Sequence, residues 1–210
     1  DWVLQRLCAG ITVTRNDLTE MGPGGLLKEI SSRPQPRDER TGQAALPVLP
    51  HAPRIAALVL AAGQSRRMGT INKMLADTAG TPMIAHTLKA VQASAVNPVV
   101  VVTGFEPDGV ETALSGFDVT YAHNPDYADG LSTSLRAGLD TLPQDIEGVV
   151  ICLGDMPAVE AGHIDKLIAA FDVEEGRAIC VPTYQGKRGN PVLWAASFFD
   201  DMRQVAGDVG

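Results

Sequence analysis

The chain has 210 residues, of which 45% are hydrophobic and 20% are charged, and its formal net charge is −8. This composition predicts a folded protein with a substantial core and argues against general disorder. The acidic balance argues against nonspecific binding to nucleic acid or to anionic membranes. No apolar run approaches the roughly 20 residues that a membrane-spanning helix needs. We therefore expect neither nucleic acid nor a membrane as a partner.

The first 53 residues differ in composition from the rest of the chain. Residues 2–30 form a short periodic segment with a glycine-rich turn, and residues 31–53 are rich in proline and charge, as is typical of an extended linker. We predict a remnant of a preceding domain at 1–30, a linker at 31–53 and the main domain at 54–210. A disordered leader is the alternative for 1–30. Because neither end carries a clear starting or terminating element, we expect a piece of a longer polypeptide, truncated at its C-terminus.

Strand and helix patterns alternate from Arg54 onward. The predicted strands are 55–60, 98–103, 119–122, 149–153, 178–181 and 192–194, and the predicted helices are 82–94, 110–114, 131–142, 164–171 and 197–205. Such alternation predicts an α/β fold of three α/β/α layers, in which helices cover both faces of a mainly parallel sheet. Ligands bind beyond the carboxyl ends of the strands in these sheets.

A basic loop with glycines follows the first of these strands. The run Leu60-Ala61-Ala62-Gly63 leads to Arg66 and Arg67, and Lys73 lies just beyond. Glycines let a backbone approach a ligand, exposed N–H groups bind anions, and arginine binds phosphate oxygens in pairs. The spacing matches neither a P-loop nor a G-x-G-x-x-G dinucleotide fingerprint. The loop predicts binding of a nucleoside triphosphate, and a plain basic surface loop is the alternative.

An aspartate follows the strand 149–153, in the sequence Gly154-Asp155-Met156-Pro157. A carboxylate at the end of a strand is well placed to hold Mg²⁺, which takes one or two carboxylates together with substrate phosphates and water. A turn aspartate before a proline is the alternative. Together with the basic loop, Asp155 predicts a metal-assisted phosphate site.

Three further segments are candidates for the same site. The run 124–138 joins a strand to a helix, and Gly130, Ser132 and Ser134 are predicted to line a nucleotide pocket, while Ser132 or Thr133 is expected to cap the helix. The run 186–192 is typical of a hairpin turn. Asp208, near the end of the chain, is a further candidate acidic residue.

The cysteines and histidines do not suggest a metal site or a disulfide framework. Cys8, Cys152 and Cys180 are odd in number, widely spaced and free of Cys-x-x-Cys pairs, which predicts reduced thiols in the cytoplasm rather than disulfides or zinc. The four histidines lack ligand spacing and are expected to be structural. No G-x-S-x-G elbow occurs, so a serine hydrolase is not supported.

The motifs together resemble the nucleotidyltransferases that activate sugars and cofactors, whose signature is L-A-A/G-G-x-x-x-R-M-G-x-x-K. The matching residues are Leu60, Ala61, Ala62, Gly63, Arg67, Met68, Gly69 and Lys73. The run 124–138 resembles the Asn-Pro-x-x-x-x-Gly-x-x-x-Ser-Leu stretch of the molybdenum cofactor cytidylyltransferases. The guanylyltransferase branch carries Gly-Pro-Leu-Ala-Gly there and tends to Leu-Ala-Gly-Gly in the first loop, so both departures favour CTP. Residues 1–30 resemble the end of a molybdopterin-binding domain.

The resemblance implies a Rossmann-like nucleotidyltransferase that moves CMP from CTP to a molybdopterin-type cofactor, with Mg²⁺ and release of pyrophosphate. The implied catalytic residues are Arg67, Lys73 and Asp155. The implied nucleotide contacts are Leu60, Ala61, Ala62, Gly63, Arg66, Lys73, Gly130, Ser132 and Ser134. The implied metal ligands are Asp155 and Asp208, and the implied acceptor contacts are Gly189, Asn190 and Pro191. A molybdoenzyme that receives the product is an expected partner.

Three alternatives stay open at this point. The first is the same chemistry with GTP. The second is a cytidylyltransferase that acts on methylerythritol phosphate or on a sugar phosphate. The third is a nucleotide-binding regulator or chaperone of a molybdoenzyme, without catalysis of its own.

Overall fold

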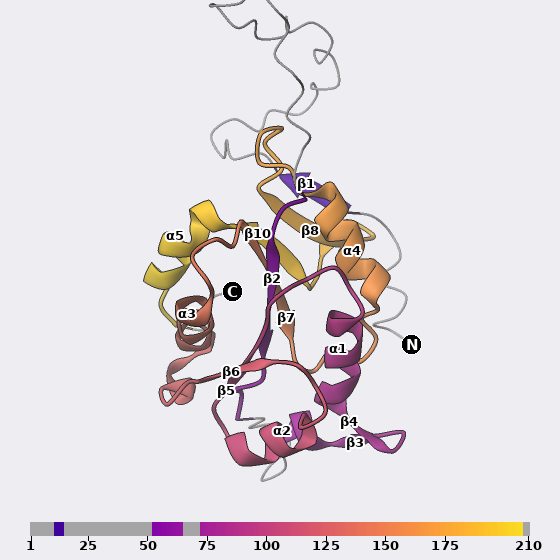
Figure 1. Ribbon diagram of the computed structural model, residues 1–210, viewed down its shortest axis with the longest axis vertical. Helices are drawn as coiled ribbons and strands as arrows, with labels where there is room; N and C mark the ends of the chain where they lie inside the picture. Colours follow the sequence, from indigo (N-terminus) through magenta and orange to yellow (C-terminus); the bar gives the residue numbers. More distant parts are fainter. Residues whose placement is uncertain (1–10, 15–51, 65–71, 208–210) are drawn as a thin grey trace, which may run out of the picture. The chain divides into compact units, whose positions relative to one another are not determined.

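The computed structural model describes residues 11–14, 52–64 and 72–207 (Figure 1). All of its helices and strands belong to one unit, which contains Asp1–Asn16 and Arg54–Gly210. The second unit, Asp17–Pro53, lies almost wholly outside the described residues. The predicted domain boundaries at residues 30 and 53 therefore stay a prediction.

One mainly parallel sheet forms the centre of the described fold. Its strands are β1 (Ile11–Thr14), β2 (Ile55–Leu60), β5 (Val99–Thr103), β6 (Thr120–His123), β7 (Gly148–Leu153), β8 (Ile179–Tyr184), β9 (Lys187–Arg188) and β10 (Val192–Ala195). Their order is β1-β8-β10-β7-β2-β5-β6, with β9 paired to β8. β7, β2, β5 and β6 are parallel neighbours. β10 is antiparallel to both β7 and β8, so β8 runs in the same direction as β7.

Helices cover both faces of this sheet. They are α1 (Met83–Gln92), α2 (Pro107–Ala113), α3 (Leu131–Thr141), α4 (Ala161–Ala170) and α5 (Phe199–Gln204), with 3-10 turns η3 (Lys73–Leu75), η4 (Tyr127–Asp129) and η5 (Ala196–Phe198). Figure 1 shows α1 and α4 on one side of the sheet and α3 and α5 on the other. A small separate hairpin joins β3 (Asp77–Thr78) to β4 (Thr81–Pro82). None of the helices in the described ranges is long and apolar enough to cross a membrane.

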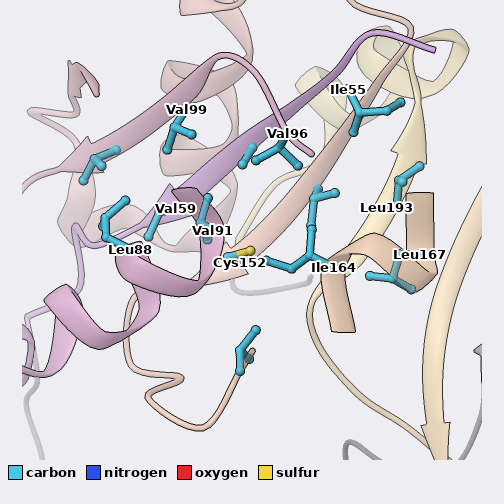
Figure 2. Packing of buried hydrophobic residues seen from close by; sticks show 14 of the residues in the cluster. Ile55, Val59, Leu88, Val91, Val96, Val99, Cys152, Ile164, Leu167 and Leu193 are labelled. Carbon is cyan, nitrogen blue, oxygen red and sulfur yellow. The ribbon is translucent and has the colours of Figure 1, made fainter. Parts of the chain in front are cut away.

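The central strand β2 explains why the sheet needs helices on both faces. All six of its residues are buried, and successive side chains point to opposite faces. Ile55 and Val59 belong to a cluster with α1 and α4, whereas Leu58 belongs to a second cluster with α3 and α5. Figure 2 shows the first cluster, in which Leu88 and Val91 of α1 pack with Ile164 and Leu167 of α4 against the strands. β2 is apolar along its whole length because helices cover both faces of the sheet at this strand.

The predicted fold class is confirmed. The strands β1, β3, β4 and β9 were not predicted, and the other differences lie at the ends of the elements. α4 begins at Ala161 rather than 164, because Glu160 and His163 form a capping box there. The predicted cap of α3 is wrong: the helix begins at Leu131, Gly130 is its N-cap, and no side chain caps it. Thr133 Oγ1 instead donates to the carbonyl oxygen of Gly130 at 2.9 Å. The predicted helix 197–205 is a 3-10 turn followed by the shorter α5.

Candidate active site

A cleft lies where β2 and β7 end side by side. Leu60 and Leu153 are paired at the carboxyl ends of these parallel strands, so the segments that follow both strands start at the same edge of the sheet. The cleft has a volume of about 350 Å³, and its lining residues are Leu60, Ala62, Gly63, Gln64, Met74, Tyr127, Ala128, Gly130, Leu131, Ser134, Leu153 and Asp155. Its position is the one that parallel α/β sheets use for ligands.

Lys73 contacts Asp155 although 82 positions separate them in the chain. Asp155 lines the cleft, whereas Lys73 is not one of its lining residues. Lys73 Nζ donates to Asp155 Oδ2 at 2.7 Å, and the two side chains are 38% and 30% exposed. Lys73 comes from η3, just beyond the basic loop, and Asp155 comes from the segment after β7. The structure therefore brings together the cation and the carboxylate that the sequence singled out.

Close packing fixes the backbone beside Asp155. The N–H of Gly154 donates to the carbonyl oxygen of Leu60 at 2.9 Å. A Cβ added at Gly154 would lie 2.8 Å from Met74 Sδ and 3.1 Å from that same carbonyl oxygen. Glycine is required here because the strand ends approach each other so closely.

The start of α3 forms another wall of the cleft. Gly130, at φ 116°, and Ser134 line it, and both belong to the run 124–138 that the sequence singled out. Asn124 is buried and holds this wall, since its Nδ2 donates to Ser134 Oγ at 3.0 Å and its Oδ1 accepts from the Asp126 N–H. Ser132 is also buried but is not a lining residue, and its N–H donates to the carbonyl oxygen of Gly207 at 3.2 Å.

Ala61 likewise lies behind the cleft rather than in its lining. It is fully buried, and its N–H donates to the carbonyl oxygen of Val102 at 2.9 Å. Ala62 and Gly63 next to it do line the cleft. The glycine loop therefore contributes through its later residues, while Ala61 anchors the loop to β5.

Tyr127 is a lining residue that the sequence interpretation missed. It comes from η4 and makes a tilted ring contact with Phe105, at 6.4 Å between ring centroids. A Cβ at Gly104 would lie 2.6 Å from Tyr127 Cβ, so the glycine after β5 leaves room for this side chain. The available signal was an aromatic residue inside the run 124–138, three positions before Gly130.

The predicted acceptor segment is an exposed hairpin next to the end of β7. Gln185 and Gly186 have φ of 49° and 74° and turn the chain from β8 into β9. Gly189 and Asn190 are exposed and Pro191 is buried, and none of the three lines the cleft. Because Val192 pairs with Ile151, these residues precede β10 beside the last residues of β7.

Some predicted residues lie outside the described part of the chain. These are Arg66 and Arg67 of the basic loop, Asp208 near the end, and the segment before Ile11. Within the described residues, no three His, Cys, Asp or Glu side chains gather so as to hold a metal ion. Asp155 alone fits a Mg²⁺ site that phosphates and water complete, which is how proteins commonly bind this ion.

The cysteines of the described ranges are not nucleophiles. Cys152 and Cys180 are buried free thiols. Burial raises the pKa of Cys152 to about 12. Burial also raises the pKa of Cys180 to about 11, against a smaller opposite effect of Arg177. Both thiols are therefore protonated near neutral pH, which excludes covalent catalysis by either.

Residues 57–210 match the family model described as the MobA-like NTP transferase domain. The chain belongs to this family. It is similar to the bifunctional protein GlmU of Kineococcus radiotolerans, with 32% identity over 131 residues, which cover 61% of this chain and 26% of that protein. The chain thus spans about a quarter of the length of such curated relatives, 26% and 27% for two of them.

Solved structures agree with this family. A homolog of the Mycobacterium tuberculosis protein rv0371c, from Mycobacterium sp. strain JC1, has a TM-score of 0.64 and 30% identity, over 75% of this chain and 77% of that one. A nucleotidyl transferase from Methanothermobacter thermautotroptrophicus has a TM-score of 0.63 and 27% identity, over 74% and 78%. The prediction of a nucleotidyltransferase domain with a Rossmann-like fold is confirmed.

Proposed function

We propose that the chain transfers CMP from CTP to a molybdopterin-type cofactor, with Mg²⁺ and release of pyrophosphate. The observation that carries this proposal is the 2.7 Å contact between Lys73 and Asp155 at the cleft between the ends of β2 and β7. A carboxylate in the cleft and a cation in contact with it are the groups that a magnesium triphosphate needs, one for the metal and one for the phosphate oxygens.

Nucleotide binding falls to the loop after β2 and to the start of α3. Ala62, Gly63, Gly130 and Ser134 line the cleft and offer backbone groups and a hydroxyl to the nucleoside. Lys73, with Arg66 and Arg67 of the preceding loop, binds the triphosphate. These contacts would bring the α-phosphorus close to Asp155.

The reaction itself is a displacement at phosphorus. An oxygen of the acceptor's terminal phosphate forms a bond to the α-phosphorus of CTP, the bond from that phosphorus to the bridging oxygen breaks, and pyrophosphate leaves with the electron pair. The attacking oxygen is already anionic, so no general base is required. The residues contribute alignment and neutralisation of charge, which supply most of the catalysis in phosphoryl transfer.

Asp155 would hold the metal, and we assign Asp208 as a second carboxylate. The resembling family has an aspartate in Gly-Asp-Met-Pro that ligates Mg²⁺, and Asp155 matches it. Bound Mg²⁺ would supply positive charge to the phosphate oxygens and the leaving pyrophosphate. Lys73 contacts the same carboxylate and adds its own charge to that of the metal.

The acceptor side is assigned to the hairpin that leads into β10. Gly189, Asn190 and Pro191 lie there, beside the end of β7. The pterin acceptor rests on the resemblance of residues 1–30 to a molybdopterin-binding domain and on the choice of CTP over GTP in the motifs. A cytoplasmic location and a molybdoenzyme recipient belong to the same proposal.

A pyrophosphate assay tests the proposal. The full chain is incubated with each of the four nucleoside triphosphates, Mg²⁺ and one acceptor at a time: molybdopterin-type cofactor, methylerythritol phosphate or a sugar phosphate. We expect pyrophosphate release with CTP and the pterin. Release with GTP, or with another acceptor, would instead establish the corresponding alternative. Nucleotide binding without pyrophosphate release from any pair would favour the regulator.

A further inference from the structure

Two polar side chains are buried in the layer beneath the Lys73–Asp155 pair. Thr87 of α1 is 0% exposed and Asn72 is 2% exposed. The other buried residues of α1 are Ile84, Ala85, Leu88 and Val91, all apolar. A buried polar group destabilises the fold unless it is hydrogen-bonded, so the partners of Thr87 and Asn72 show what these residues hold.

Thr87 holds the backbone that carries Asp155. Its Oγ1 donates to the carbonyl oxygen of Gly154 at 3.1 Å, across 67 positions of sequence. The N–H of Gly154 is bonded to the carbonyl oxygen of Leu60 at 2.9 Å. Both polar backbone groups of Gly154 are thus fixed, one from β2 and one from α1, and Asp155 is the next residue.

Asn72 holds the backbone that carries Lys73. Its Oδ1 accepts from the N–H of Met74 at 3.0 Å, so the bond spans Lys73. Its Nδ2 donates to the carbonyl oxygen of Phe105 at 3.2 Å. The N–H of Phe105 donates in turn to the carbonyl oxygen of Ala62 at 3.2 Å. One buried amide therefore ties the Lys73 turn to the segment after β5, which is bonded to the base of the glycine loop.

We infer that Asn72 and Thr87 are positioning residues, which set the contact between Lys73 and Asp155 before any ligand binds. A partly exposed lysine–carboxylate pair contributes little by itself and does not hold a long side chain in place. The geometry comes instead from the two pinned backbones. The consequence for turnover rests on the function proposed above, because it requires that Lys73 and Asp155 act on the triphosphate.

Thr103 offers a matched control for Thr87. It is also a threonine with 0% exposure, and it lies at the end of β5, next to the same edge of the sheet. Its Oγ1 has no hydrogen-bond partner among the described residues. Replacing either threonine with valine keeps the shape and removes the hydroxyl, but only at Thr87 does a bond to the backbone of the site disappear.

The experiment compares Thr87→Val, Thr87→Ser and Thr103→Val in the full chain by two measurements. The first is kcat and the KM for CTP. The second is the acetylation rate of Lys73 relative to the exposed Lys187, followed by mass spectrometry. In Thr87→Val we expect kcat to fall roughly 10- to 100-fold with little change in KM, since misplaced supporting groups typically cost that much. Acetylation of Lys73 should rise about threefold as its ion pair loosens.

The controls separate positioning from general packing. Thr87→Ser should restore both values, and Thr103→Val should leave both at the level of the unmodified chain. Unchanged Lys73 acetylation in Thr87→Val, or an equal loss in Thr103→Val, would overturn the inference. If the unmodified chain releases no pyrophosphate with any nucleotide, the proposed function fails, and the acetylation ratios alone decide whether Thr87 positions the pair.

Discussion

The segment after β7 and the hairpin after β8 start at the same edge of the sheet but are built differently. Gly154 is bonded through both its N–H and its carbonyl oxygen, and Asp155 next to it is paired with Lys73. From Gln185 to Asn190 every residue of the hairpin is exposed. A fixed segment suits the phosphate chemistry that the family shares, whereas an open one suits an acceptor that differs between members. Under the function proposed above, reaction type and acceptor choice would reside in separate parts of the chain.

The largest effect is expected from Asp155→Ala, which removes the carboxylate from the fixed segment. We expect kcat to fall about 10³-fold, because a preorganised group that stabilises charge in the transition state is commonly worth that much. The thermal unfolding midpoint should stay nearly constant, since a partly exposed ion pair adds little stability. Pyrophosphate release and a melting curve measure the two quantities.

Asp172→Ala is the matched control for that variant. Asp172 pairs with Arg177 at 2.7 Å, with exposures of 34% and 38%, nearly the values of the Asp155 pair. It lies before β8, away from the carboxyl end of that strand. Activity in Asp172→Ala should match the unmodified chain. Full activity in Asp155→Ala would remove the metal role from this residue.

Gly154→Ala tests whether the fixed segment depends on close packing. The new Cβ would meet Met74 Sδ, which is flexible, and the Leu60 carbonyl oxygen, which is not. We expect about tenfold lower kcat, as Asp155 moves by a fraction of an ångström, and a stability loss of about 1–2 kcal/mol. Gly162→Ala is the control, because a Cβ there meets nothing within 4 Å. Wild-type kcat in Gly154→Ala would show that the segment tolerates displacement.

The sequence predicted the sheet well because burial on both faces leaves a local signature. β2, β5 and β7 are nearly uninterrupted apolar runs, and the structure places them at the centre of the sheet. The two-residue strands β3, β4 and β9 were not predicted, since two residues carry no periodicity. Lys73 and Asp155 could be singled out because each follows a predicted strand, and parallel strands bring such ends together.

The supporting residues could not be found in the same way. Thr87 reads as one more residue of an amphipathic helix, and its partner Gly154 is 67 positions away. Asn72 depends likewise on Phe105, at a separation of 33 positions. Ser132 was placed in the pocket together with Ser134, but residues two positions apart on a helix point to different faces, and only Ser134 lines the cleft. Hydrogen bonds between polar groups that are far apart in the sequence can be recognised only from the three-dimensional structure.

The open hairpin is tested by Lys187→Ala combined with Arg188→Ala. Both side chains are exposed, and they are adjacent basic residues on a chain of net charge −8. We expect the KM for the acceptor to rise about fivefold, with kcat and the KM for CTP unchanged, because exposed charges attract an anionic substrate without entering the chemical step. Arg54→Ala, an exposed arginine before β2 that pairs with Asp145, is the control. If the KM for the acceptor rises equally in Arg54→Ala, the effect comes from the net charge of the protein and not from the position of Lys187 and Arg188.

Thiol labelling compares how easily β7 and β8, the strands that lead into the two segments, open to solvent. Each of these strands carries one buried cysteine. Cys152 lies on β7 and Cys180 on β8, and their side chains are 1% and 0% exposed. Labelling at pH 8 must therefore proceed through opening of the structure. We expect Cys180 to react faster than Cys152, since β8 leads into the open hairpin. A Cys8→Ser background confines labelling to these two residues, and faster labelling of Cys152 would contradict the comparison.

The smallest effect is the loss of stability that these thiols cause at alkaline pH. Burial raises the pKa of Cys152 from 9.0 to about 12, so above pH 9 the unfolded chain ionises a thiol that the folded chain keeps protonated. The free energy of unfolding therefore falls as pH rises from 9 toward 12, by about 1 kcal/mol per thiol between pH 9 and 10. In Cys152→Ala this decline, measured by urea unfolding, should be shallower by that amount. An unchanged slope would mean that β7 opens enough for Cys152 to ionise within the folded protein, and the segment carrying Asp155 would then be no more fixed than the hairpin.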